Sequence, residues 1–184
     1  MNAYDLPTSL TVGEVGYPIR YGWRAVVDVL EVCADPEVDE VGKAMYMLMV
    51  MFPTWKDMPG EHIQEALEKA AAFIDCGQKA DRSKPKLIDW KQDASIIVAE
   101  INNVAKREIR LDPQLHWWTV FGWFMSIGEG RLAAMIHIRQ KRSKRQKLEK
   151  WEQDFYRDNK ALVDFQTVES EEVRREKDNI LKFL

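Results

Sequence analysis

Three histidines and two cysteines are the side chains of this sequence best suited to chemistry, and their spacing does not assemble a reaction centre. His62, His116 and His137 lack the i, i+4 spacing of a helical metal pair. Cys33 and Cys76 have no histidine or second cysteine nearby in the sequence that would activate a thiolate. We therefore expect no catalytic residues, no metal site and no cofactor, and a protein that is not an enzyme.

A basic run from Arg139 to Lys150 could bind phosphate groups. Residues 131–150 hold 8 basic and 1 acidic residue, whereas residues 1–80 hold 13 acidic and 6 basic residues. This charge density suits a nucleic acid backbone, but no aromatic residue interleaves the run before Trp151. An acidic protein surface fits equally well, so we expect a protein partner and keep nucleic acid as the alternative. The candidate partner-binding residues in the run are Arg139, Lys141, Arg142, Lys144 and Arg145.

A tryptophan-rich helix over residues 115–127 is the expected centre of the fold. Asp112 and Pro113 supply a helix cap and a first-turn proline, and His116 is expected to cap or pack. The helix is apolar on nearly every side, which favours burial over display to a partner. A strip of small residues, Thr119, Gly122 and Ser126, is expected to admit a close neighbour. The predicted core residues are Trp117, Trp118, Phe121, Trp123 and Phe124.

Helical periodicity dominates the rest of the chain. Residues 6–20 read as a small β-hairpin whose turn is bracketed by Gly13 and Gly16, with Pro18 marking an edge strand. The sequence therefore predicts an all-α fold of six or seven helices with a small N-terminal β-hairpin. Apolar residues recur at i, i+3 and i+4 in segments 23–34, 41–52, 60–76, 90–104 and from 132 into the basic run.

Two features are expected near the C-terminus. Leu148, Trp151, Phe155, Leu162 and Phe165 have heptad-like spacing and predict an apolar seam that is interrupted by Asp158. Residues 168–184 are charged, with a thin apolar stripe, and are expected to be an amphipathic helical extension of a core domain over residues 1–167. The candidate partner-binding residues in this extension are Val173, Ile180, Leu181 and Leu184.

The totals place the protein among ordinary single-domain chains. A chain of 184 residues can bury one core without disulfides, and two cysteines do not make a disulfide framework. The N-terminus lacks the charged and apolar regions of a secretory signal. The tryptophan-rich run is shorter than the about 20 apolar residues that span a bilayer. We therefore expect a cytosolic protein without a membrane segment.

Five motifs follow one another in the sequence: Leu6–Ser9, Tyr17–Ile19 within the hairpin, Ala72–Gly77, Ile88–Ala94 and His116–Trp118. Together they resemble the bacteriophage "gene product fifteen" family, which occurs in the tail-gene modules of siphophages and related prophages. The resemblance spans roughly residues 6–165, and the basic run and the segment after Phe165 depart from the family pattern.

The resemblance implies a tail assembly chaperone that works in the host cytoplasm. Such a protein would bind the tape measure protein, keep it soluble and help to recruit the major tail protein, which forms the tail tube. It implies no catalytic residues, and it leaves room for a homo-oligomer. Two alternatives stay open: a nucleic-acid-binding protein that uses residues 139–150, and a minor structural component of the tail.

Overall fold

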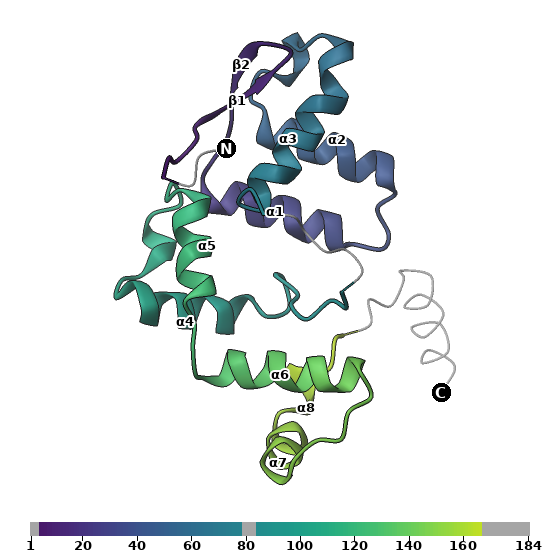
Figure 1. Cartoon of the computed structure of the whole chain (residues 1–184), viewed down its shortest axis with the longest axis vertical. Helices are drawn as coiled ribbons and strands as arrows, with labels where there is room; N and C mark the ends of the chain where they lie inside the picture. The colour runs from purple at the N-terminus through teal and green to yellow at the C-terminus, as the bar shows by residue number, and fades with distance from the viewer. Residues whose placement is uncertain (1–3, 79–83, 167–184) are drawn as a thin grey trace, which may run out of the picture.

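The computed structural model is all-α with a small N-terminal hairpin, which confirms the predicted fold class (Figure 1). The structure describes residues 4–78 and 84–166. These residues form eight α-helices, against the six or seven expected, together with three short 3-10 helices. The α-helices are α1 Trp23–Ala34, α2 Glu40–Met51, α3 Ile63–Ile74, α4 Ala94–Ala105, α5 Trp117–Met125, α6 Arg131–Ser143, α7 Lys150–Asp158 and α8 Lys160–Val163, and the 3-10 helices are η1 Trp55–Asp57, η2 Gly60–His62 and η3 Ile109–Leu111.

The predicted hairpin is present and rests on the start of α3. Strands β1 (Ser9–Val12) and β2 (Val15–Pro18) pair antiparallel. The turn residues Gly13 and Glu14 both have positive φ, 50° and 67°, as two-residue hairpin turns require. A Cβ added to Gly13 would lie 2.2 Å from the ring Nε2 of His62, so glycine is needed for space as well as for conformation.

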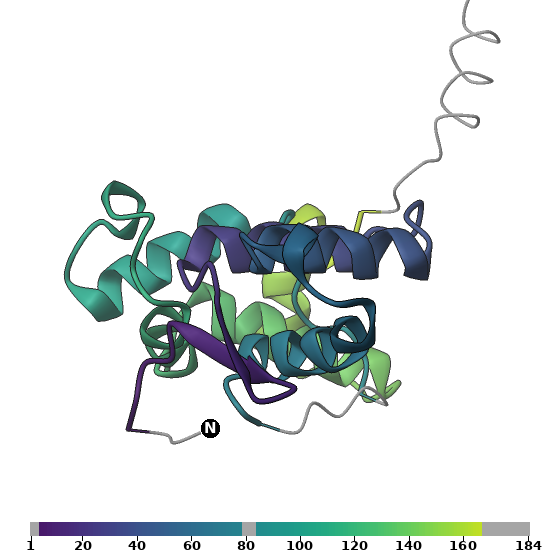
Figure 2. The same ribbon diagram turned by 90° about the horizontal axis from the view of Figure 1, so that it is seen from above.

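The helices form three groups that share one hydrophobic core. In Figure 1, α1, α2 and α3 lie with the hairpin at one end, α4 and α5 lie beside α1, and α6, α7 and α8 occupy the opposite end. Within the group of α1, α2, α3 and the hairpin, Figure 2 shows α1 and α2 along one side and α3 and the hairpin along the other. The largest fully buried apolar side chains are Trp117, Phe52, Phe73, Leu48 and Met51.

Helix α5 differs from the expectation at its start and on one of its faces. It begins at Trp117 and not near residue 115. Its N-cap is His116, whose ring Nδ1 accepts the backbone N–H of Trp118 at 3.1 Å, which confirms the expected capping role of this histidine. The Asp112–Pro113 pair lies in the preceding turn. The small-residue strip does not admit a neighbour: Gly122 is exposed, and nothing would lie within 4 Å of a Cβ there. The strip faces solvent because the apolar contacts of α5 are made on its other sides.

Acid should weaken the fold through His116. Burial lowers the pKa of His116 from its ordinary value of 6.5, although the hydrogen bond to the carbonyl of Pro7 opposes this. Since Nδ1 accepts the N–H of Trp118, the ring is neutral and Nε2 donates to Pro7 at 3.0 Å. As the pH falls, His116 is therefore protonated in the unfolded chain before it is protonated in the folded chain. This stability contribution is complete above about pH 6.5 and is lost as the pH falls towards the folded pKa.

Asparagine at position 116 offers a matched test, because its side-chain oxygen can accept the same backbone N–H. Urea unfolding at about pH 7.5, 6.5 and 5.5 should give a shallower fall in stability for His116→Asn than for the natural chain. Equal slopes for the two proteins would show that His116 does not carry the effect.

The C-terminal seam over residues 148–165, predicted with an interruption at Asp158, is divided next to that residue. The chain turns at Asn159 and divides the segment into α7 and α8. Trp151, assigned to the seam, is 51% exposed, whereas Glu152 beside it is fully buried. The register is shifted because the carboxylate of Glu152 pairs with Lys141 and contacts His137, both on α6, and these partners make its burial tolerable. The extension over residues 168–184 lies outside the described residues.

Candidate functional site

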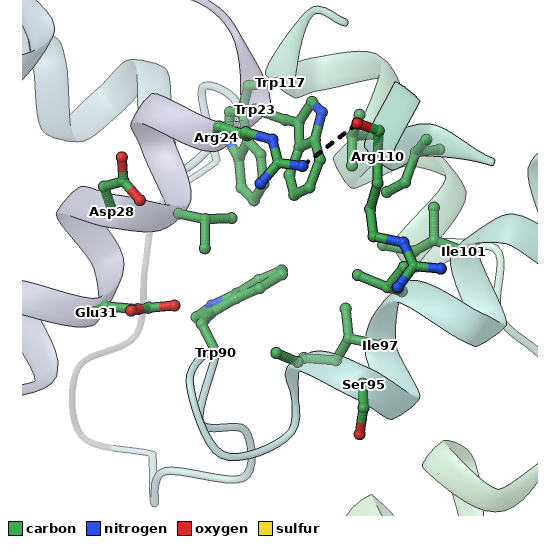
Figure 3. Close-up of a pocket in the computed structure, with 15 residues that line it drawn as sticks. Trp23, Arg24, Asp28, Glu31, Trp90, Ser95, Ile97, Ile101, Arg110 and Trp117 are labelled. Carbon is green, nitrogen blue, oxygen red and sulfur yellow. Dashed lines mark hydrogen bonds between the residues drawn. The ribbon is translucent and has the colours of Figure 1, made fainter. Parts of the chain in front are cut away.

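An open cleft of about 290 Å³ lies between α1, α4 and α5 (Figure 3). Its walls are mostly apolar, and its bottom is formed by buried side chains of α4 and α5, including Ile97, Ile101 and Val120. Three tryptophans from different parts of the chain reach it: Trp23, Trp90 and Trp117. We refer to this site as the tryptophan cleft.

Hydrogen bonds fix two of the three indoles. The ring N–H of Trp23 donates to the carbonyl of Asp112 at 3.1 Å, and that of Trp117 donates to the carbonyl of Ile74 at 2.8 Å. Trp90 lies edge-on to Trp117, with the ring centroids 5.6 Å apart. The cleft is therefore lined by aromatic surfaces whose orientation is set before any ligand binds, which reduces the entropy lost on binding.

Charged residues lie on separate sides of the tryptophan cleft. Figure 3 shows Arg24, Asp28 and Glu31 on the α1 side and Arg110 on the opposite side, with Trp90 between Glu31 and Arg110. The guanidinium of Arg24 donates to the backbone carbonyl of Arg110 at 3.4 Å. Burial, with a further contribution from Asp28, raises the pKa of Glu31. Arg110 is held at 2.6 Å from Glu108 and lowers the pKa of that carboxyl to about 2. The α1 side of the cleft therefore carries both signs of charge, and Arg110 opposite it is already paired with Glu108.

The chemistry available in the tryptophan cleft is recognition of apolar groups. Among the described residues that line it, Ser95 is the one hydroxyl, and neither a histidine nor a cysteine accompanies it. Elsewhere in residues 4–78 and 84–166, no group of three or more His, Cys, Asp or Glu side chains is arranged to hold a metal ion. A cleft of this composition suits leucine-, methionine- or phenylalanine-sized side chains of a partner chain.

Arg139, assigned to the partner-binding basic run, is instead buried in the fold. It is 5% exposed, and its guanidinium makes a two-pronged pair with the carboxylate of Asp93, with N–O distances of 2.5 and 2.9 Å. Asp93 is fully buried. Further donor groups of Arg139 reach the carbonyls of Leu87, Leu162 and Val163. Arg139 therefore joins α6 to the start of α4 and to α8. Its side chain is not accessible to a partner.

Lys141 and Arg142 also have partners within the chain. The ammonium group of Lys141 lies 2.6 Å from the buried carboxylate of Glu152, and His137 approaches the same oxygen at 3.0 Å. Burial alone would raise the pKa of Glu152, but Lys141 and the backbone N–H of Glu149 outweigh it and hold the pKa below its usual range. Arg142 pairs with Asp164 at 3.2 Å. Three cations of the basic run are thus paired with Asp93, Glu152 and Asp164, and none of these carboxylates belongs to the acidic first 80 residues.

Lys144 and Arg145 remain exposed at the turn between α6 and α7, and no ion pair to them occurs among the described residues. Of the predicted core residues, Trp117 is 1% exposed, whereas Trp118, Phe121, Trp123 and Phe124 are partly buried and pack against the core. Nothing can be placed for the last group of candidates, Val173, Ile180, Leu181 and Leu184, which lie outside the described residues.

The fold and the tryptophan cleft together define a small helical protein with a preformed apolar binding site. A comparison with known families identifies it more closely: the family described as Bacteriophage Gp15 protein matches residues 3–165. The chain therefore belongs to this bacteriophage family, which confirms the resemblance seen in its motifs. No curated protein and no solved structure matches it significantly. Within the described part of the chain, no helix has the length and apolarity to cross a membrane.

Proposed function

We propose that this protein is a non-enzymatic phage tail assembly chaperone that binds the tape measure protein and helps to recruit tail-tube subunits. It would act in the host cytoplasm before the tail is complete. Membership of a bacteriophage family over nearly the whole described chain is the observation that carries the proposal. The tryptophan cleft supports it, because a chaperone for a long chain needs a surface that covers apolar side chains until the tube encloses them.

The tryptophan cleft is suited to a helical or extended segment that offers one or two apolar side chains. Trp90 is partly exposed and supplies aromatic contact area, which dominates the energetics of many interfaces, whereas Trp23 and Trp117 are buried and form the walls of the cleft. Charged side chains that line the cleft, Arg24 and Glu31 on α1 and Arg110 opposite them, can bind polar residues that flank the apolar ones. The site is therefore expected to discriminate by the pattern of the segment, apolar in the middle and charged at the ends, more than by a single side chain.

Filling the tryptophan cleft should abolish this binding without unfolding the protein. Ala94 is exposed and lines the cleft, so Ala94→Trp places an indole in the space that the partner would use. Ala99, an exposed alanine of the same helix that does not line the cleft, gives the matched control Ala99→Trp. With overlapping fragments of the tape measure protein of the same phage as probes, we expect Ala94→Trp to weaken binding by about tenfold or more in calorimetry. Ala99→Trp should bind as the natural protein does.

The same mixtures discriminate between the chaperone and its alternatives. If the natural protein binds DNA tightly, with an affinity that falls steeply with salt, and ignores every tape measure fragment, it is a nucleic-acid-binding protein. The internal pairing of Arg139, Lys141 and Arg142 argues against that outcome. Mass spectrometry of purified particles provides a second test. A chaperone should be absent from them, whereas a minor structural component should be present in fixed proportion.

A further inference from the structure

The turn between α6 and α7 exposes four cations and one tryptophan. Lys144, Arg145, Lys147 and Lys150 are all exposed, and within the described residues no carboxylate pairs with any of them. Trp151 follows directly and is 51% exposed. We refer to these five residues as the basic turn.

The tryptophan of the basic turn is held in place despite its exposure. Its ring stacks on His137, with the ring planes 11° apart, and its N–H donates to the carboxylate of Glu149 at 3.2 Å. The turn backbone is also fixed, because Arg145 adopts a positive φ of 54° and Gln146 donates its N–H to the carbonyl of Lys141 at 2.8 Å. An ordered, half-exposed tryptophan surrounded by unpaired cations is a common form of interface anchor.

A second opening, of about 580 Å³, lies among α1, α2 and α3. Its floor is apolar and includes Leu30, Met47, Leu67 and Ala71. Three carboxylates line it, those of Glu40 on α2 and of Glu68 and Asp75 at α3. Glu40 pairs with Lys43, the one cation among the lining residues, at 2.9 Å, and Glu68 accepts an N–H of the neutral Gln64 at 2.8 Å, so the rim is net acidic. We refer to this opening as the acid-rimmed groove. Its volume is in the range that accommodates an aromatic side chain.

The basic turn and the acid-rimmed groove are complementary but do not meet within one molecule. Figure 1 shows α6 and α7 on one side of α1, and α2 and α3 on the other. Lys141 and His137 hold Glu152 of α7 against α6, and this contact keeps the basic turn at the α6 end of the molecule. The groove of a second copy of the chain can approach the basic turn without any change in the fold of either copy.

We propose that the basic turn of one copy docks in the acid-rimmed groove of a second copy, with Trp151 entering the groove and the four cations facing its carboxylates. The two surfaces are different, so the contact is head-to-tail. A pair joined by one such contact keeps a free groove on one copy and a free turn on the other, so further copies can add in the same way to form a ring or an open row. This self-association goes beyond the proposed chaperone function, and it could hold whether or not the tryptophan cleft binds the tape measure protein.

Charge reversal on either surface provides the test. We expect the full-length chain to associate with increasing concentration in sedimentation velocity at roughly 50 mM salt, and to become monomeric at roughly 500 mM salt. Lys144→Glu with Lys147→Glu should abolish association, and so should Glu40→Lys with Glu68→Lys. Trp151→Ala should lower the association constant by about tenfold or more.

Mixing the two charge-reversed proteins gives the decisive result. In the mixture, each acidic turn meets a basic groove and each natural turn meets a natural groove, so association should return. The control Lys56→Glu with Lys160→Glu changes the net charge by the same amount at exposed lysines outside both surfaces, and should associate as the natural chain does. A natural chain that stays monomeric at low salt, or a mixture that stays monomeric, would overturn the proposal. Loss of association in the control would also overturn it, because net charge alone would then govern the effect.

Discussion

Replacing Arg139 by methionine should lower the free energy of unfolding by about 3–5 kcal/mol. The substitution leaves the carboxylate of Asp93 fully buried without its cation. It also removes the donors to the carbonyls of Leu162 and Val163, which hold α8 in place. Urea unfolding followed by circular dichroism would measure the loss.

Two further variants separate the buried pair from charge in general. Arg142→Met removes an arginine three residues away whose side chain is 43% exposed and pairs with Asp164, so it should cost only about 0–1 kcal/mol. Arg139→Met combined with Asp93→Leu removes both buried charges and should recover much of the loss. If Arg139→Met and Arg142→Met lower the free energy of unfolding equally, the buried pair of Arg139 and Asp93 does not stabilise the fold more than the exposed pair does.

Truncating Trp117 to alanine should cost about 3–5 kcal/mol, the second large effect expected. The side chain is 1% exposed, its N–H donates to the carbonyl of Ile74, and its ring contacts Trp90 and Phe121. The loss of packing would also leave a buried carbonyl without its donor.

Trp123→Ala is the control on the same helix, because Trp123 is only partly buried. Trp123→Ala should lower the free energy of unfolding clearly less than Trp117→Ala in the same urea experiment, and unfolding should stay cooperative. Equal losses at the two positions would mean that α5 is supported evenly around its circumference, as its composition suggests, and not through Trp117.

The sequence predicts the elements of this fold well, because local signals define most of them. Helical periodicity places α1, α2 and α4 close to their observed bounds. Local chemistry misleads at α5, where Asp112 and Pro113 have the right types for a helix start, yet the ring of His116 provides the cap. Composition misleads there too: a run that is apolar on nearly every side predicts full burial, but the position of α5 in the fold leaves Gly122 and Met125 exposed.

The sites are less predictable, since each depends on which segments meet. The inward positions of Trp23 and Trp90 follow from periodicity, but a cleft between them follows only from how α1 lies against α4. The burial of Arg139 had one local signal. Arg139 continues the i, i+3, i+7 spacing of the buried residues Leu132 and Met135, and so lies on the apolar face of α6. Its pairing with Asp93, 46 residues earlier, has no local signal.

The contacts of Gln92 bear on the order in which the chain can fold during its synthesis. The side chain of Gln92 donates to the carbonyl of Asp164 and accepts the N–H of Gln166, both at 2.9 Å, so its partners are 72 and 74 residues later in the sequence. On the ribosome, the segment around Gln92 emerges well before these partners, and neighbouring Asp93 emerges before Arg139. The junction of α4 with α6 and α8 therefore closes only when translation has passed residue 166, and the N-terminal helices must hold their shape until then.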